Sequence, residues 1–180
     1  FKHKFKHKKQ NINKLMVTGS SAGAYGAKLN FPYLQSAFPR VNAMLLSDAG
    51  AAVVTDGFIQ SAFTHNGVWK VNKTLPHIFS DALGTFSADN FNIDIMTRLS
   101  QTYPKSRFAE YTTQFDEVQV QFLKIMDQLD QGNDNPSTWG LSEADFTYFG
   151  EWNMRMETSL IYLSENTDNY QYYIGAGSIH

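Results

Sequence analysis

Ser21 stands in a Gly-Ser-Ser-Ala-Gly pentapeptide, which follows an apolar, β-prone run from Leu15 and precedes an alanine-rich run typical of a helix. A strand, a tight turn and a helix are the context that a nucleophilic serine on an elbow needs. Gly19 and Gly23 lack a Cβ, so the strand and the helix can approach each other closely. The backbone amide of Ala22, at the start of the helix, can then bind a developing oxyanion. Such pentapeptides also occur in ordinary turns, so it is this context that makes Ser21 a candidate nucleophile.

A serine nucleophile needs a base that takes its proton and an acid that orients the base. His180 is the only histidine that follows both a predicted strand and every candidate acid. Two aspartates compete for the role of the acid, because Asp48 follows the second predicted strand and Asp116 follows the third. Both would lie at the carboxyl edge of a parallel sheet, where ligands bind. An aspartate placed like Asp116 is also a common helix N-cap, and spacing leaves both aspartates open.

The pattern of apolar and turn residues predicts a single α/β domain, 1–180, with a mostly parallel sheet and helices on both of its faces. We expect Pro32 to kink the first helix or end it early. We expect the region 56–106 to form short helices and loops over the sheet edge, apart from one longer helix near its end. The predicted strands are 15–19, 42–47, 107–113 and 169–174, and the predicted helices are 22–34, 93–103, 117–129 and 142–164.

Composition and charge argue against several classes of protein. The net charge is −2, and the lysines gather within residues 1–14, so no folded basic face for a nucleic acid is indicated. There is no cysteine, and His3 and His7 have metal-ligand spacing without a carboxylate beside them, so we expect no metal and no cofactor. No apolar run is long enough to span a membrane, and no signal peptide is visible.

Four stretches of the chain, taken in order, resemble the pectin acetylesterase family, which includes Notum-like carboxylesterases. They are Gly-Ser-Ser-Ala-Gly-Ala-Tyr-Gly, Leu-Leu-Ser-Asp-Ala-Gly, Phe-Asp-Glu-Val-Gln, and a strand that ends in Gly-Ser-Ile-His. The resemblance implies the α/β-hydrolase fold, with Ser21 as nucleophile, Asp116 as acid and His180 as base. Asp48 then matches a structural aspartate near the site, and we expect its carboxylate to accept hydrogen bonds from nearby backbone amides or side chains.

The resemblance also implies the activity of a serine esterase that removes O-acetyl or other short acyl groups, from a polysaccharide. In the family a glycine-rich loop before the elbow strand supplies the first oxyanion donor, and nothing before Leu15 is glycine-rich. We therefore expect a fragment, truncated at both ends and lacking N-terminal strands, that shows little esterase activity by itself. At full length we expect a protein that is secreted or periplasmic. The alternatives are another serine carboxylesterase, lipase-like hydrolase or peptidase, and a non-catalytic carbohydrate-binding relative.

Overall fold

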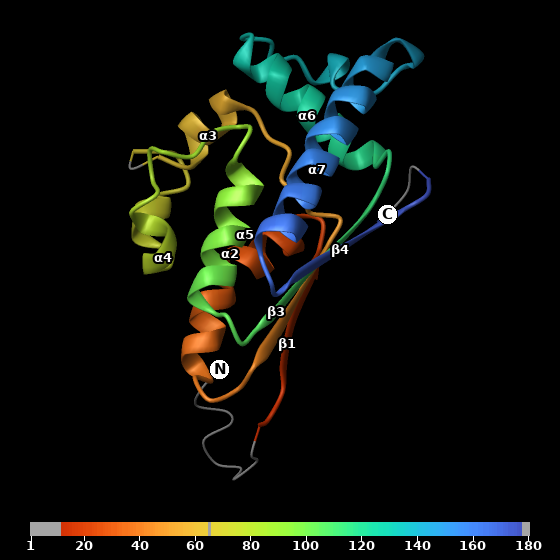
Figure 1. Ribbon diagram of the computed structural model, residues 1–180. Helices are drawn as coiled ribbons and strands as arrows, with labels where there is room; N and C mark the ends of the chain where they lie inside the picture. Colours follow the sequence, from red (N-terminus) through yellow and green to blue (C-terminus); the bar gives the residue numbers. More distant parts are fainter. Residues whose placement is uncertain (1–11, 65, 178–180) are drawn as a thin grey trace.

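The computed structural model describes residues 12–64 and 66–177. Its centre is a four-stranded, all-parallel sheet in the order β1-β2-β3-β4 (Figure 1). The strands are β1 (Leu15–Ser20), β2 (Ala43–Asp48), β3 (Arg107–Thr113) and β4 (Tyr170–Gly175), which confirms the four predicted strands. The helices are α2 (Ala22–Ala37), α3 (Asp56–Ala62), α4 (His77–Ser80), α5 (Phe91–Thr102), α6 (Glu117–Asp130) and α7 (Phe146–Asn166). Three short 3₁₀ turns are η1 (Val71–Lys73), η2 (Pro136–Thr138) and η3 (Glu143–Asp145).

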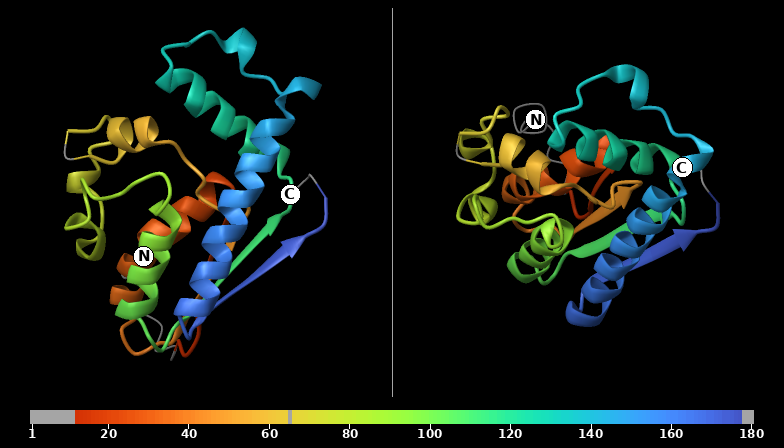
Figure 2. Two further views of the ribbon diagram at one scale, coloured as in Figure 1. Left: turned by 45° about the horizontal axis from the view of Figure 1, so that its top comes forward. Right: turned by 90° about the horizontal axis from the view of Figure 1, so that it is seen from above.

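The helices α2, α5 and α7, which pack on the sheet and on one another, lie side by side along one of its faces (Figures 1 and 2). A row of neighbouring strand residues is buried there, made of Val17, Leu45, Phe108 and Tyr170. The strands lie in the sheet in the same order as in the chain. Each connection is therefore a crossover to the next strand in one direction, and right-handed crossovers of this kind all pass over the same face of the sheet. The expectation of helices on both faces is therefore wrong for the described residues.

The opposite face of the sheet carries apolar side chains that remain exposed. Met16 is 59 % exposed, its cross-strand neighbour Met44 is 53 % exposed, and Tyr173 on β4 is 67 % exposed. Tyr111 on β3 stacks against Tyr173, with 5.8 Å between the ring centroids. Parallel sheets are normally covered on both faces, so this apolar surface favours association.

Pro32 lies inside α2 and does not end it, because the helix continues to Ala37. Of the two expected effects, a kink or an early end, the early end is therefore wrong. A proline in a helix interior costs about 3 kcal/mol, and tertiary packing offsets this cost here. Phe31 is fully buried and packs edge-on against Phe108, with 5.2 Å between the ring centroids. Gln35 in the last turn donates to the carbonyl of Val41 at 2.8 Å.

Residues 55–64 and 66–90 form short helices, turns and loops, as predicted. Their aromatic side chains gather into one cluster rather than being scattered over the surface. Phe63 and Phe86 both pack edge-on against Phe91 of α5, at centroid distances of 4.9 and 5.3 Å. Trp69 packs edge-on against Phe58 of α3 at 5.4 Å. These ring contacts link α3 to α5 directly, although η1 and α4 lie between the two helices in the chain.

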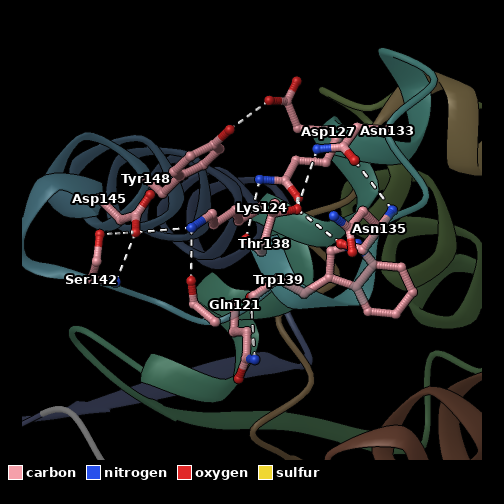
Figure 3. Close-up of polar contacts among 12 residues, drawn as sticks. Gln121, Lys124, Asp127, Asn133, Asn135, Thr138, Trp139, Ser142, Asp145 and Tyr148 are labelled. Carbon is pink, nitrogen blue, oxygen red and sulfur yellow. Dashed lines mark hydrogen bonds and ion pairs between the residues drawn. The ribbon is translucent and has the colours of Figure 1, made fainter.

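α6 extends beyond the carboxyl ends of the strands and contacts α3 and α7. Its side chains also bind the long connection to α7 (Figure 3). Lys124 forms an ion pair with Asp145 at 2.9 Å, and hydrogen bonds from Ser142 and Lys124 lower the pKa of Asp145. Tyr148 of α7 donates to the Asp127 carboxylate at 2.6 Å, which raises the pKa of Tyr148 to about 12. These contacts fix the far end of α6 and so support its N-terminus at the sheet edge.

Candidate active site

Ser21 occupies the turn between β1 and α2 in a backbone conformation that residues with a Cβ rarely adopt. Its φ is 53° and its ψ is −123°. Its N–H donates to the main-chain carbonyl of Asp48 at 2.8 Å, which ties the turn to the end of β2. Although Ser21 stands at the N-cap of α2, its hydroxyl makes no capping hydrogen bond to the helix. Strain of this kind costs about 1–3 kcal/mol and gathers at functional sites.

The two glycines of the pentapeptide have different roles. A Cβ built on Gly19 would lie 2.1 Å from the carbonyl oxygen of Gly23, so only glycine fits at position 19. A Cβ on Gly23 would meet no described atom within 4 Å. The expectation that both glycines permit the close approach is therefore right for Gly19 and wrong for Gly23, which contributes only its backbone. Ala22 is the first residue of α2, where amides have no acceptor within the helix.

Asp48 lies beside the elbow, as expected, but through its main chain. Its carbonyl accepts the Ser21 N–H, whereas its half-buried carboxylate accepts no hydrogen bond from the described residues. The expectation of a hydrogen-bonded structural carboxylate is thus wrong within this part of the chain. The reason is that Asp48 is the last residue of β2 and its strand-end carbonyl, not its side chain, faces the turn.

Asp116 follows β3 at the same carboxyl edge of the sheet as Ser21, because all four strands are parallel. It is fully buried and is the N-cap of α6. Its Oδ1 accepts the backbone N–H of Gln119 at 3.0 Å, and its Oδ2 accepts from the Gln119 side-chain amide at 2.9 Å. The N-cap interpretation of Asp116 is confirmed, and a capping aspartate is equally placed to act at this edge.

His180 lies outside the described residues, as do His3, His7 and His65. The chain that leads toward it, however, begins beside Asp116. Past the end of β3, the N–H groups of Gln114 and Phe115 donate to the carbonyls of Gly175 and Gly177, at 2.9 and 3.0 Å. The segments that follow β3 and β4 are therefore hydrogen-bonded to each other as far as Gly177, three residues before His180.

Residues 48–52, the bridge segment, form a strained turn after β2. Ala49 and Ala52 have φ values of 51° and 56°, in the left-handed region that disfavours residues with a Cβ. Between them, a Cβ on Gly50 would lie 2.4 Å from the Cβ of Ala24 in α2. The turn is thus pressed against the first turns of the elbow helix.

Each residue of the bridge segment makes a contact through its backbone to the Ser21 turn, to α2, to β3 or to α6. In chain order, these contacts join Asp48 O to Ser21 N (2.8 Å), Ala49 N to Tyr111 O (2.8 Å), Gly50 O to Lys28 Nζ (2.7 Å), Ala51 N to Gln119 Oε1 (3.0 Å), and the Ala52 backbone to the Tyr25 hydroxyl. Burial raises the pKa of Tyr25, and the charges of Glu110 and Asp116 add to this effect. The bridge segment connects the elbow to the acid, which the sequence did not predict.

A buried ion pair lies behind this segment, between Lys28 of α2 and Glu110 of β3. Lys28 also donates to Asn92 Oδ1 at 2.7 Å, while Asn92 and Tyr170 each donate to Glu110 at 3.0 Å. Burial lowers the pKa of Lys28, and the charge of Glu110 opposes this shift. Burial together with Glu110 raises the pKa of Tyr170 well above its ordinary value. Nothing in the apolar pattern of α2 indicated that its lysine would be in the core.

Comparisons with known proteins add no relative: no family model, curated protein or solved structure matches the chain. No group of histidine, aspartate and glutamate side chains suited to a metal ion occurs among residues 12–64 and 66–177. Within these same ranges, no helix has the length and apolar character that crossing a membrane requires.

Proposed function

We propose that the chain belongs to a serine esterase of the α/β-hydrolase type, with Ser21 as nucleophile, His180 as base and Asp116 as acid. The observation that carries the proposal is the strained backbone of Ser21 at a strand–helix turn, with a hydroxyl that the helix does not use. An ordinary capping serine would bind the helix amides and needs no strain. The shared sheet edge of Ser21 and Asp116 supports the same assignment.

The reaction follows from these roles. Ser21 Oγ attacks the ester carbonyl carbon while its proton passes to His180, and the Ala22 N–H stabilises the oxyanion. Collapse of this intermediate expels the alcohol, which takes the proton from His180 and leaves an acyl group on Ser21. Water, deprotonated by His180, then releases the carboxylic acid and restores the serine. Asp116 orients His180 and stabilises its charged form, and no metal or cofactor is needed.

The substrate we propose is an O-acetyl ester on a polysaccharide, handled by a protein that is secreted or periplasmic at full length. This choice rests on the resemblance of the four sequence stretches to pectin acetylesterases, since a fold does not fix a substrate. Ala22 supplies one oxyanion amide. A second donor from the family's glycine-rich loop would raise turnover by about 100- to 1,000-fold.

A series of p-nitrophenyl esters tests the proposal and its nearest rivals. Where the second oxyanion donor is present, we expect hydrolysis of the acetyl ester, much slower hydrolysis of long-chain esters, and loss of hydrolysis in Ser21→Ala. Ala22 alone should support only slow, Ser21-dependent hydrolysis. Faster turnover of long-chain esters would favour a lipase-like enzyme, and hydrolysis that Ser21→Ala leaves intact would exclude the proposed site. Asp116→Asn should abolish turnover while Asp48→Asn should largely preserve it, and the reverse result would make Asp48 the acid.

A further inference from the structure

We infer that Gln119 is a positioning residue, which sets the orientation of Asp116 and couples it to the backbone of Ser21. This inference rests on the proposed function, because it assigns a role within the same site. Gln119 lies one turn into α6 and is 7 % exposed. It belongs to the Phe-Asp-Glu-Val-Gln stretch, in which the sequence alone assigned it no role.

The side-chain amide of Gln119 has a partner for its oxygen and two for its nitrogen. Its Nε2 donates to Asp116 Oδ2 at 2.9 Å and to Thr112 Oγ1 at 3.2 Å. Its Oε1 accepts the backbone N–H of Ala51 at 3.0 Å. The amide therefore has one orientation that satisfies its neighbours, since a flipped amide would oppose donor to donor at Ala51 and acceptor to acceptor at Asp116.

Helix capping does not account for this side chain. The backbone N–H of Gln119 already caps α6 by donating to Asp116 Oδ1. The side-chain amide adds a second donor on the other carboxylate oxygen. Donors on both oxygens fix the rotation of the carboxylate plane, which one capping bond leaves adjustable. An acid that must orient a base benefits from this restraint because small misplacements slow catalysis strongly.

The same amide connects the acid to the nucleophile. Ala51, which donates to Gln119, lies three residues after Asp48, whose carbonyl holds the N–H of Ser21. Between these two contacts the bridge segment has the strained left-handed residue Ala49. A displacement of the bridge segment would thus move the Ser21 turn and the Gln119 amide together, and the relative position of nucleophile and acid would be preserved.

Steady-state kinetics of p-nitrophenyl acetate hydrolysis tests the inference with three variants. Gln119→Met keeps the length of the side chain and removes its hydrogen bonds. Gln119→Glu keeps the acceptor for Ala51 and replaces the amide donor with a second carboxyl group beside Asp116, which disturbs the acid directly. Gln121→Met is the matched control, since Gln121 is half-buried on the same helix and donates to the carbonyl of Trp139 at 3.3 Å, away from the acid.

We expect both changes at Gln119 to lower kcat by about 10- to 100-fold with KM changed less than about twofold. Gln121→Met should keep the wild-type kcat, and its melting temperature should fall less than that of Gln119→Met, because Gln121 makes one side-chain hydrogen bond and Gln119 makes three. Where Gln119→Met does not fold, Gln119→Glu alone decides the outcome.

Three results overturn the inference, and they are distinguishable. Wild-type kcat in a folded Gln119 variant, while Ser21→Ala is inactive, refutes the role of Gln119 and leaves the proposed function standing. Equal losses of kcat in the Gln119 and Gln121 variants also refute it, because a general loosening of α6 would then explain both. Absence of Ser21-dependent hydrolysis in the wild type overturns the proposed function, and the inference with it.

Discussion

Replacing Lys28 by methionine removes an ammonium group from the core and leaves the carboxylate of Glu110 without its counter-charge. The two side chains are only 1 % and 2 % exposed. Removing one partner of a buried ion pair costs about 3–5 kcal/mol. Asn92, Tyr170 and Ser47 still donate to Glu110, so we take the lower end of this range and expect a loss of about 3 kcal/mol.

A double variant separates the charge from the packing. Lys28→Met with Glu110→Gln removes both charges and keeps an oxygen that accepts from Asn92 and Tyr170. We expect the double variant to recover about 1–3 kcal/mol of the loss, as residues coupled in one network do. Glu110→Gln alone should also destabilise, because burial already lowers the pKa of Lys28 and the opposing charge is then absent.

Thermal unfolding followed by circular dichroism measures these effects. For a chain of this length, a loss of about 3 kcal/mol lowers Tm by roughly 6–12 °C. The exposed Lys105 provides the control, since Lys105→Met should change stability by less than about 0.5 kcal/mol. The reasoning is refuted if Lys28→Met shifts Tm no more than this control, or if the double variant is as unstable as the two single losses added together.

Close packing at the elbow, the exposed sheet face and the Asp145 carboxylate each give a further prediction. Gly19→Ala should lower Tm, by overpacking that costs about 1–3 kcal/mol, while Gly23→Ala should leave Tm unchanged or raise it slightly. Equal changes of Tm in the two variants would contradict the clash expected between a Cβ at position 19 and the Gly23 carbonyl oxygen. Threonine in place of both Met16 and Met44 should reduce self-association in sedimentation velocity, and unchanged association would mean that another surface is responsible. The lowered pKa of Asp145 means that its carboxylate stabilises the fold fully above about pH 4 and progressively less as pH falls. The urea midpoint of the wild type should fall between about pH 7 and about pH 3, and Asp145→Asn should make this fall smaller. A fall as large as in the wild type would mean that other carboxylates cause the loss of stability in acid.

The strands and most helices could be predicted because their signals are local. Apolar runs bounded by turn residues predict the ends of β1 and β3 to within one residue. Asp116, at the start of a run with helical periodicity, predicts the N-terminus of α6. Pro32 misled the prediction because the contacts that carry α2 past it come from distant residues. The covered face of the sheet depends on strand order, which periodicity does not contain, and exposed Met16 and Met44 look like core residues in the sequence.

The sequence identified candidate side chains for the site but not the backbone contacts that hold them. Ser21 could be nominated from its motif, whereas chain order left Asp48 and Asp116 both open and only the family resemblance selected Asp116. The bridge segment acts through carbonyls and amides that any sequence supplies. For Asp48 this difference led to the wrong group, the carboxylate instead of the carbonyl. Gln119 stands three residues after a helix-capping aspartate, the spacing of a capping box, but that pattern predicts a bond to the Asp116 backbone N–H and not the observed bond to the Asp116 carboxylate. Lys28 left no signal, because its partner is 82 residues away.

Reaction with a fluorophosphonate probe tests the central claim most directly, because such a probe modifies a serine only where a base activates it. Intact-mass measurement followed by peptide mapping identifies the modified residue. The account predicts one adduct, on Ser21, whose formation is abolished in Ser21→Ala and His180→Ala and slowed in Asp116→Asn. No adduct on the wild-type chain, or labelling of Ser21 at an equal rate in the His180 and Asp116 variants, would contradict it.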